Sequence, residues 1–449
     1  MYNTLFLPEL REMLAAANRA ELEEFCQALN AGRTAEFMEG LADDEVWQVL
    51  QFADPTRRAE IFGYFPHQRK LTLLEQSPSA QAAELIEELP SDDRVDLIQE
   101  MSGQRADQIM PLLPLEDRRD IQRLQSYPDE TAGALMTSEV AMLEEHLTVR
   151  EALEELGRQS SELETIYYLY VVDDKNLLRG VVSTRQLVSS LKTPTRTLGE
   201  IMESDVIAAL VSDDQETVAE RVERFNLLAI PVVDSGRQLL GIITHDDVID
   251  VVREELAEDA QRIAAVEPLE GNFLKVGLWT LSWKRGLWLT ILFFAALLTA
   301  FALRHYEVEL DKFAWLVWFI PLIISAGGNS GSQSATLVIT AMTSGEVKFR
   351  DWPEVLRREV IVAFGLGSFL AMIGFAVALF IAPSPRAAMV IPFTLLSVIV
   401  CGCLCGATLP IVFKRLGLDP AMMSNPFVAG IVDILGIVIY INIARALLG

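Results

Sequence analysis

The stretch "NPFVAGIVD" ends in a carboxylate, Asp433, although the apolar residues "ILGIVIYINIA" follow it directly. An unpaired charge inside a bilayer costs at least a few kcal/mol, and intramembrane acids usually face a partner or a water-filled path. Asp433 lies eight residues after Asn425, which is about 12 Å along a helix and in the middle third of a membrane. No Lys or Arg lies at matching depth in another apolar stretch. We therefore expect a cation as its partner; the alternative is a structural Asp that is bonded to a neighbouring helix.

A second polar stretch at membrane depth is "GGNSGSQSAT", residues 327–336. Glycine permits close backbone approach or local unwinding, and polar backbone is tolerated there only beside protein or a wet cavity. We expect the span to be broken near this stretch. A face of small residues that packs against another helix is the alternative.

Five apolar stretches are long enough to cross a bilayer, which takes roughly 17–25 residues. They cover residues 286–303, 313–342, 360–382, 387–413 and 425–448. An odd number places the two termini on opposite sides of the membrane. Basic residues gather on the side that an inside N-terminus makes cytoplasmic. The start of the chain predicts no secretory signal, so we expect an inner-membrane protein with its N-terminus in the cytoplasm and its C-terminus outside.

The charge of the chain is divided between two halves. The net charge is −26, but residues 271–449 carry a net +4 and residues 1–270 carry a net −30. Such acidity excludes nucleic acid as a partner, because phosphate binding needs a basic surface. Acids cluster at residues 92–96 and 213–216, and a stripe of acids runs along residues 247–258 toward the first span. Like-charged faces repel unless cations bridge them, so a divalent cation is expected to compact this half; a solvated acidic face is the alternative.

An internal repeat lies within the acidic half. Residues 171–187, "VVDDKNLLRGVVSTRQL", align without gaps with residues 232–248, "VVDSGRQLLGIITHDDV", and each copy follows a helical stretch. The order resembles a tandem pair of CBS modules, which sense ligands or regulate an attached domain. In nucleotide-binding modules a Ser or Thr is followed by an Asp three residues later, a spacing that fits Thr244 and Asp247. The first copy has Gln186 in place of the Asp, so at most one ATP site per pair is expected.

The remaining parts predict neither catalysis nor disulfides. Residues 7–124 are expected to form a train of short helices with an Asp at several helix entries, as in a helical superhelix. No Ser-His-Asp set, H-E-x-x-H motif or Gly-rich phosphate loop occurs, so we do not expect an enzyme. Cys401, Cys403 and Cys405 lie in an apolar stretch, where helix packing is favoured over a soft-metal site.

Taken together, the chain resembles the MgtE family of magnesium transporters and channels over its whole length. The motifs that carry the resemblance are "YPDETAGALMT" (127–137), "GGNSGSQSAT" and "NPFVAGIVD". The resemblance implies a multidomain integral membrane protein. Its parts would be an α-helical superhelical N domain (1–130), a tandem α/β CBS pair (131–250), a long acidic connecting or plug helix (251–275) and a five-helix α transmembrane domain (276–449).

The resemblance also implies a homodimer whose pore lies on the two-fold axis, lined by the second and fifth spans. The pore ion would be held by Asp433, Asn425 and Ala429, with Gly328, Asn329, Gln333 and Gly430 lining the path. The cytosolic sensor acids would be Asp92, Asp96, Asp214, Glu216, Asp247, Glu255, Glu258, Asp259 and Asp419. Two departures are Asn226, where many members carry another acid, and Ser332, where some carry a second Asn.

The chemistry of these groups agrees with Mg²⁺ as both the transported and the regulatory ion. Mg²⁺ keeps several waters and binds through one or two carboxylates, whereas Ca²⁺ prefers more direct oxygens and soft metals prefer Cys or His. We therefore expect import of Mg²⁺ that its own binding to the cytosolic acids closes. A Co²⁺, Mn²⁺ or Ni²⁺ carrier or exchanger on the same fold is an alternative. A membrane-tethered nucleotide sensor without transport is another, although a mere anchor needs neither the polar second span nor Asp433.

Overall fold

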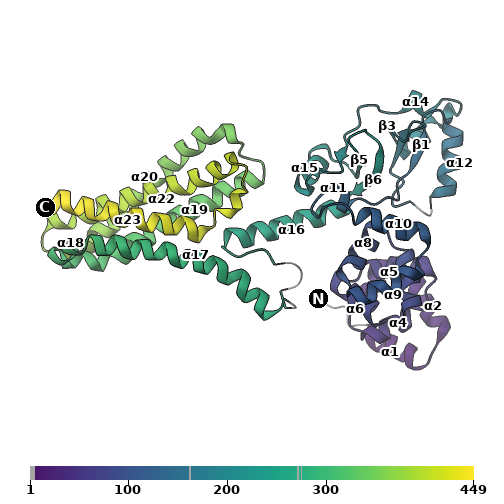
Figure 1. The fold of residues 1–449 in the computed structure, drawn as a ribbon, viewed down its shortest axis with the longest axis horizontal. Helices are drawn as coiled ribbons and strands as arrows, with labels where there is room; N and C mark the ends of the chain where they lie inside the picture. Colours follow the sequence, from purple (N-terminus) through teal and green to yellow (C-terminus); the bar gives the residue numbers. More distant parts are fainter. Residues whose placement is uncertain (1–5, 161–162, 270–272, 275) are drawn as a thin grey trace. The chain divides into compact units, whose positions relative to one another are not determined.

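The computed structural model describes residues 6–160, 163–269, 273–274 and 276–449. This part of the chain divides into two compact units, Met1–Arg253 and Glu254–Gly449. Figure 1 shows the helices and strands of each unit. The units are described separately below.

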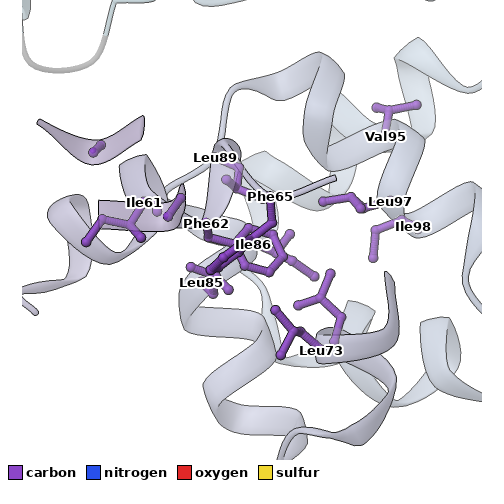
Figure 2. Packing of buried hydrophobic residues seen from close by; sticks show 14 of the residues in the cluster. Ile61, Phe62, Phe65, Leu73, Leu85, Ile86, Leu89, Val95, Leu97 and Ile98 are labelled. Carbon is purple, nitrogen blue, oxygen red and sulfur yellow. The ribbon is translucent and has the colours of Figure 1, made fainter. Parts of the chain in front are cut away.

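Short helices form the first part of the Met1–Arg253 unit. In chain order they are α1 (Leu7–Ala15), α2 (Arg19–Ala28), α3 (Ala31–Met38), α4 (Asp43–Leu50), α5 (Pro55–Gly63), α6 (His67–Gln76), α7 (Ser79–Glu87), α8 (Ser91–Glu100), α9 (Gly103–Ile109) and α10 (Leu115–Leu124). From α3 onward each helix packs against the next but one, as α3 does on α5 and α6 on α8. This alternation produces the predicted superhelix. Figure 2 shows its core, where Phe62 and Phe65 meet Leu85 and Ile86.

The acids at the helix entries act in two different ways. Asp54 caps α5, because its side chain accepts a hydrogen bond from the amide of Arg57 at 3.0 Å. At α8 the position before the helix is Pro90, and Asp92 and Asp93 lie inside the first turn. There a carboxylate interacts favourably with the helix dipole without capping the helix. The prediction of Asp caps is therefore correct for α5 and wrong for α8.

Two α/β modules complete this unit and repeat one topology. The first contains β1 (Met142–Glu144), α12 (Val149–Gln159), β2 (Tyr168–Val172), β3 (Leu178–Ser183) and α13 (Thr184–Ser189); the second contains β4 (Ala209–Leu210), α15 (Gln215–Phe225), β5 (Ala229–Val233) and β6 (Leu239–Thr244). In each module the first strand is parallel and the third antiparallel to the middle strand. The ladder is irregular at Val171/Val172 and again at Val232/Val233, the same place in the two aligned copies. The repeat seen in the sequence is thus a repeat of backbone geometry.

Helix α16 (His245–Ile263) leaves the second module without a break. It begins six residues before the predicted connecting segment 251–275 and ends inside that segment. Residues 264–269 that follow are not helical, and residues 270–272 and 275 lie outside the described residues.

The Glu254–Gly449 unit contains, among the described residues, five helices long and apolar enough to cross a membrane. They are α17 (Leu278–His305), α19 (Ile320–Thr343), α20 (Trp352–Ile381), α22 (Val390–Arg415) and α23 (Asn425–Leu448). Short helical segments precede four of them: α18 (Glu307–Lys312) with Ala314–Phe319, then Phe349–Asp351, α21 (Pro385–Ala388) and Pro420–Met422. Helix α22 packs against α19, α20 and α23, and α17 packs on α23. The predicted five-span domain is confirmed.

The expected break in the second span is wrong, because α19 is one continuous helix. Its glycines serve a close helix crossing with α22. A Cβ on Gly402 would lie 2.5 Å from the carbonyl oxygen of Gly327, and a Cβ on Gly406 would lie 2.1 Å from that of Gly331. Small residues one turn apart on both helices let the two backbones touch.

This crossing predicts the effect of one methyl group. Gly406→Ala should lower the melting temperature of the purified protein in detergent, since the added Cβ meets a backbone oxygen that cannot move aside. Overpacking of this kind costs about 1–3 kcal/mol. Gly365→Ala in α20 is the matched control, because nothing lies within 4 Å of its added Cβ. Equal melting temperatures for the two variants would contradict this account of the crossing.

Candidate functional site

Helices α19 and α23 place polar groups opposite one another over three successive turns. A Cβ on Gly328 would lie 3.3 Å from Oδ1 of Asp433 and 3.4 Å from the Cβ of Ala429. One turn further along α19, the Ser332 hydroxyl donates to the carbonyl oxygen of Asn425 at 3.0 Å. The absence of a side chain at Gly328 therefore lets the Asp433 carboxylate lie against the backbone of α19.

The third of these turns on α19 holds the side chain of Asn425. The Thr336 hydroxyl donates to Asn425 Oδ1 at 3.1 Å and to the Ser332 carbonyl at 3.0 Å. Ser332, which departs from the family pattern, thus holds the Asn425 backbone from α19. The sequence motifs of the second and fifth spans form one structural group. The family resemblance implied that these two spans lie together.

The other predicted pore residues, Asn329, Gln333 and Gly430, have different surroundings. Asn329 and Gln333 are exposed in the described chain, and the Asn329 amide donates to Ser325 Oγ at 3.2 Å. Gly430 faces α17, where a Cβ would lie 3.9 Å from that of Ala295. Gly430 is therefore on a different side of α23 from Ala429.

A second group of carboxylates lies within the Met1–Arg253 unit. Asp92 and Asp96 come from α8, Asp247 comes from the first turn of α16, and Glu164 lies between α12 and β2. Asp92 Oδ1 is buried and has no hydrogen-bond partner among the described residues. A buried carboxylate oxygen without a donor is costly, and a cation is the group that would satisfy it.

The electrostatics of this cluster show how crowded the acids are. Burial, and then the charge of Asp247, raise the pKa of Asp92 well above its ordinary value. Burial is also the main reason that the pKa of Asp96 and that of Asp247 rise to about 6. The pKa of Glu164 rises to about 7, through burial and then the charge of Glu139. Each of these acids therefore keeps its proton to a higher pH than an ordinary carboxyl does, and positive charge nearby would lower its pKa again.

Sequence reasoning missed Glu164 as a member of this cluster. Its backbone amide donates to the Glu139 carbonyl oxygen at 3.1 Å, which holds the loop between α12 and β2 against the segment that precedes β1. No periodicity or motif marks such a loop residue, so only the fold could reveal its proximity to Asp247.

Asp214 and Glu216 lie at the start of α15. Asp214 is the N-cap residue and accepts the amide of Glu216 at 3.0 Å. The neighbouring Asp213 is paired with Arg221 at 2.6 Å. Asp214 therefore has a capping function, and its carboxylate is exposed.

A third group of acids lies within the Glu254–Gly449 unit, at the C-terminal end of α16. Arg262 forms ion pairs with Glu258 on its own helix and with Asp419, which precedes α23. Burial raises the pKa of Asp259 to about 6, followed by the charges of Asp419 and Glu255. The four predicted acids Glu255, Glu258, Asp259 and Asp419 are thus close enough to interact, with Arg262 among them.

The predicted nucleotide pair, Thr244 and Asp247, has a structural function in the same fold. The Thr244 hydroxyl and amide both donate to Asp247 Oδ2, which caps the start of α16. Ser183 and Gln186 form the corresponding capping box in the first module. The spacing of both pairs is therefore explained by helix capping, and it does not by itself require a nucleotide.

Soft-metal ligands do not gather around the cysteines of α22 in the described residues. Cys403 is buried and its thiol lies 3.9 Å from the Ser330 carbonyl oxygen, at the crossing with α19. A separate surface group combines Glu144, His146 and Asp174, all exposed, with His146 already paired to Glu144 at 3.2 Å.

The parts of the chain are those of a multi-pass membrane protein that also carries a helical superhelix and two α/β modules. Family models match a divalent cation transporter domain (MgtE) at residues 320–443, an MgtE intracellular N domain at 29–130 and CBS domains at 132–193 and 198–254. The chain belongs to the MgtE family of divalent cation transporters.

Relatives of known function support this membership. A magnesium transporter MgtE from Thermus thermophilus is 36% identical, over 75% of this chain and 74% of its own. One from Enterococcus faecalis is 35% identical, over 73% and 72%. The solved soluble part of a magnesium transporter is 33% identical with a TM-score of 0.53, and covers 56% of this chain and 98% of its own. The cytosolic domain of the Mg²⁺ channel MgtE in complex with ATP is 32% identical with a TM-score of 0.50, over 54% and 98%.

The raised pKa values predict how α8 responds to pH in Mg²⁺-free buffer. Asp96 and Asp247 have a folded pKa of about 6 against an ordinary 3.8. The folded state therefore binds more protons than the unfolded state, and stability falls as pH rises from about 4 to about 7. Hydrogen exchange in α8, corrected for its intrinsic pH dependence, should be slower at pH 5 than at pH 7.5.

Two variants separate this effect from general charge repulsion. Asp247→Asn should flatten the pH dependence, because it removes one titrating carboxyl from the cluster. Asp250→Asn should leave it unchanged, because Asp250 is an exposed acid paired with Arg253 on the same helix. Protection in α8 that increases toward pH 7.5 in the wild type would contradict the assignment of these pKa shifts.

Proposed function

We propose that this protein imports Mg²⁺ down its electrochemical gradient along a path lined by α19 and α23. The observation that carries the proposal is the position of Asp433 against Gly328, one turn from Ala429 and two turns from Asn425. An acid at this depth needs a partner. At Gly328, α19 offers only backbone to the Asp433 carboxylate, so a hydrated cation in the path would be the partner.

The chemistry of the group favours Mg²⁺ over other divalent ions. Mg²⁺ dehydrates reluctantly and is usually bound through one or two carboxylates with its waters retained. Asp433 supplies a carboxylate, and the Asn425 amide and the Ala429 carbonyl supply neutral oxygens for those waters. The relatives from Thermus thermophilus and Enterococcus faecalis are magnesium transporters, which agrees with this choice. No catalytic step is proposed for the chain.

A homodimer would complete this path. Asn329 and Gln333 are polar and exposed on a helix of the membrane domain, and a two-fold axis beside them would keep both away from lipid and bring two Asp433 carboxylates together. In the second CBS module, α15 and α16 border an open groove of about 620 Å³ that is lined by Leu228, Ile249 and Val252. These three apolar side chains are 39–48% exposed. Contact with a second copy of the module would cover them.

The direction of transport follows from the charge of the loops. Basic residues near the ends of the spans gather at Lys284–Arg285, Arg357–Arg358 and Lys414–Arg415. By the positive-inside rule this distribution supports an orientation with the acidic modules in the cytoplasm and the C-terminus outside. The cell membrane potential, negative inside, then drives cations inward.

Cytosolic Mg²⁺ would close the path by binding to the acids of both units. Asp92, Asp96 and Asp247 would form one binding region, and Glu255, Glu258, Asp259 and Asp419 another, with Asp214 and Glu216 as further ligands. The unpartnered oxygen of Asp92 and the raised pKa values support this proposal. In this proposal α16 is the connecting element, because it contributes Asp247 to one region and Asp259 to the other.

ATP is proposed as a second ligand of the CBS pair, since the related cytosolic domain was solved with ATP. Thr244 and Asp247 would contact the ribose. Asp247 also faces Asp92, so the nucleotide and the regulatory cation would both act on the same carboxylate. Binding of ATP would thereby alter the affinity of the acidic cluster for Mg²⁺.

The transport proposal predicts the result of changing Asp433. Mg²⁺ flux into liposomes should fall to the level of empty liposomes for Asp433→Ala and Asp433→Asn, because both remove the charge that binds the ion. Glu354→Gln should retain flux, since Glu354 is an exposed acid paired with Arg357 at 2.8 Å. Wild-type flux in both Asp433 variants would rule out this path.

The regulatory proposal predicts a change in the Mg²⁺ concentration that closes the path. In liposomes with the cytosolic side accessible, Asp92→Asn should raise the half-inhibitory Mg²⁺ concentration by roughly tenfold or more, as expected for a lost ligand interaction. Asp250→Asn should not alter it. An unchanged half-inhibitory concentration for Asp92→Asn would remove this cluster from the sensor.

A further inference from the structure

Arg262 occupies the centre of the acid group at the end of α16. Its guanidinium pairs with Glu258 one turn earlier on the same helix and with Asp419 across the chain. The side chains of Arg262, Glu258 and Asp419 are 35%, 25% and 27% exposed, so the pairs are partly shielded from water. Arg262 and Asp419 are 157 residues apart in the sequence, and the fold brings them together.

The oxygens of Asp419 are both engaged in this arrangement. Oδ1 accepts the amide of Ala421 at 2.8 Å, which caps the short helix before α23. Oδ2 accepts the guanidinium of Arg262. A metal ion that binds Asp419 through Oδ2 must therefore displace Arg262 or share the oxygen with it.

Arg253, on the same helix, provides a contrast. It pairs with Asp250 at 3.0 Å, but the two side chains are 75% and 73% exposed. Exposed pairs of this kind contribute little and are readily screened. The two partly buried ion pairs of Arg262 are held more firmly, because one planar guanidinium can bridge two carboxylates.

We propose that Arg262 is a tethered cation that competes with Mg²⁺ for Glu258 and Asp419, and so raises the Mg²⁺ concentration at which the end of α16 is locked. This inference rests on the proposed regulation by Mg²⁺ and deepens it. When Mg²⁺ is scarce, the guanidinium neutralises part of the repulsion among the acids. When Mg²⁺ is abundant, the divalent ion replaces it at the carboxylates.

Replacement of Arg262 is compatible with a folded membrane domain. The next residue, Ile263, packs against the apolar core of that domain together with residues of α17, α19 and α23. The end of α16 therefore keeps an apolar anchor when the ion pairs are removed, and the variant tests the competition rather than the fold.

The test measures hydrogen exchange of residues 254–263 in the full-length protein as Mg²⁺ is titrated. Arg262→Gln should shift the midpoint of protection to lower Mg²⁺ by roughly two- to fivefold, the factor expected from a partly exposed ion pair. Arg262→Lys should lie between the wild type and Arg262→Gln, because an ammonium keeps the charge but not the fork. Arg253→Gln removes the same charge from the same helix and should leave the midpoint within experimental error of the wild type.

The outcomes distinguish this inference from the proposed function. A wild type that Mg²⁺ protects, together with an Arg262→Gln midpoint that is unchanged or higher, would overturn the competition and leave the Mg²⁺ sensor intact. An equal downward shift in Arg253→Gln would also overturn it, since general charge would then explain the effect. A wild type without any Mg²⁺-dependent protection would overturn both proposals.

Discussion

Carboxylates that are held together with too little positive charge are the constraint on which the rest of this structure depends. Burial and mutual repulsion raise the pKa of Asp92, Asp247 and Asp259, and Asp433 lies against bare backbone in a membrane helix. Each site stores unfavourable electrostatic free energy that a cation would relieve. A fold built in this way is stabilised differently at low and at high cation concentration, which is the physical requirement for a sensor.

The site around Asp433 and the acidic groups of α8 and α16 differ in the packing of the helices that carry them. Asp433 lies against α19, which crosses α22 with backbone in contact because both helices carry glycines there. Asp92 and Asp96 come from α8 and Asp247 comes from α16, where it is held by its bond to Thr244. Helices packed this closely suit the proposed ion path. Acids on separate helices suit a sensor, since their spacing can respond to the ion.

Much of this could be predicted from the sequence, and the failures have physical reasons. The five spans and the repeated module follow from apolar length and gapless repetition, whereas only the family resemblance implied that the two polar motifs lie together. The break expected in α19 was wrong because glycine has two uses, unwinding and close packing, and only the partner glycines at Gly402 and Gly406 decide between them. Glu164 and the Arg262–Asp419 pair were missed because contacts between distant loops leave no periodic signal.

The position of α16 connects these observations. Asp247 lies in the first turn of the helix, where the acids of α8 repel it, and the helix ends with Ile263, which packs on the membrane domain. In the proposed regulation, a cation at Asp92 and Asp247 and a cation near Asp259 would bind residues of the same helix. Arg262 belongs to the membrane end alone, so the charge at that end can be set independently of the cluster around Asp92. If both groups bind the cation as proposed, coupling between them would make the response to the ion steeper than either group gives by itself.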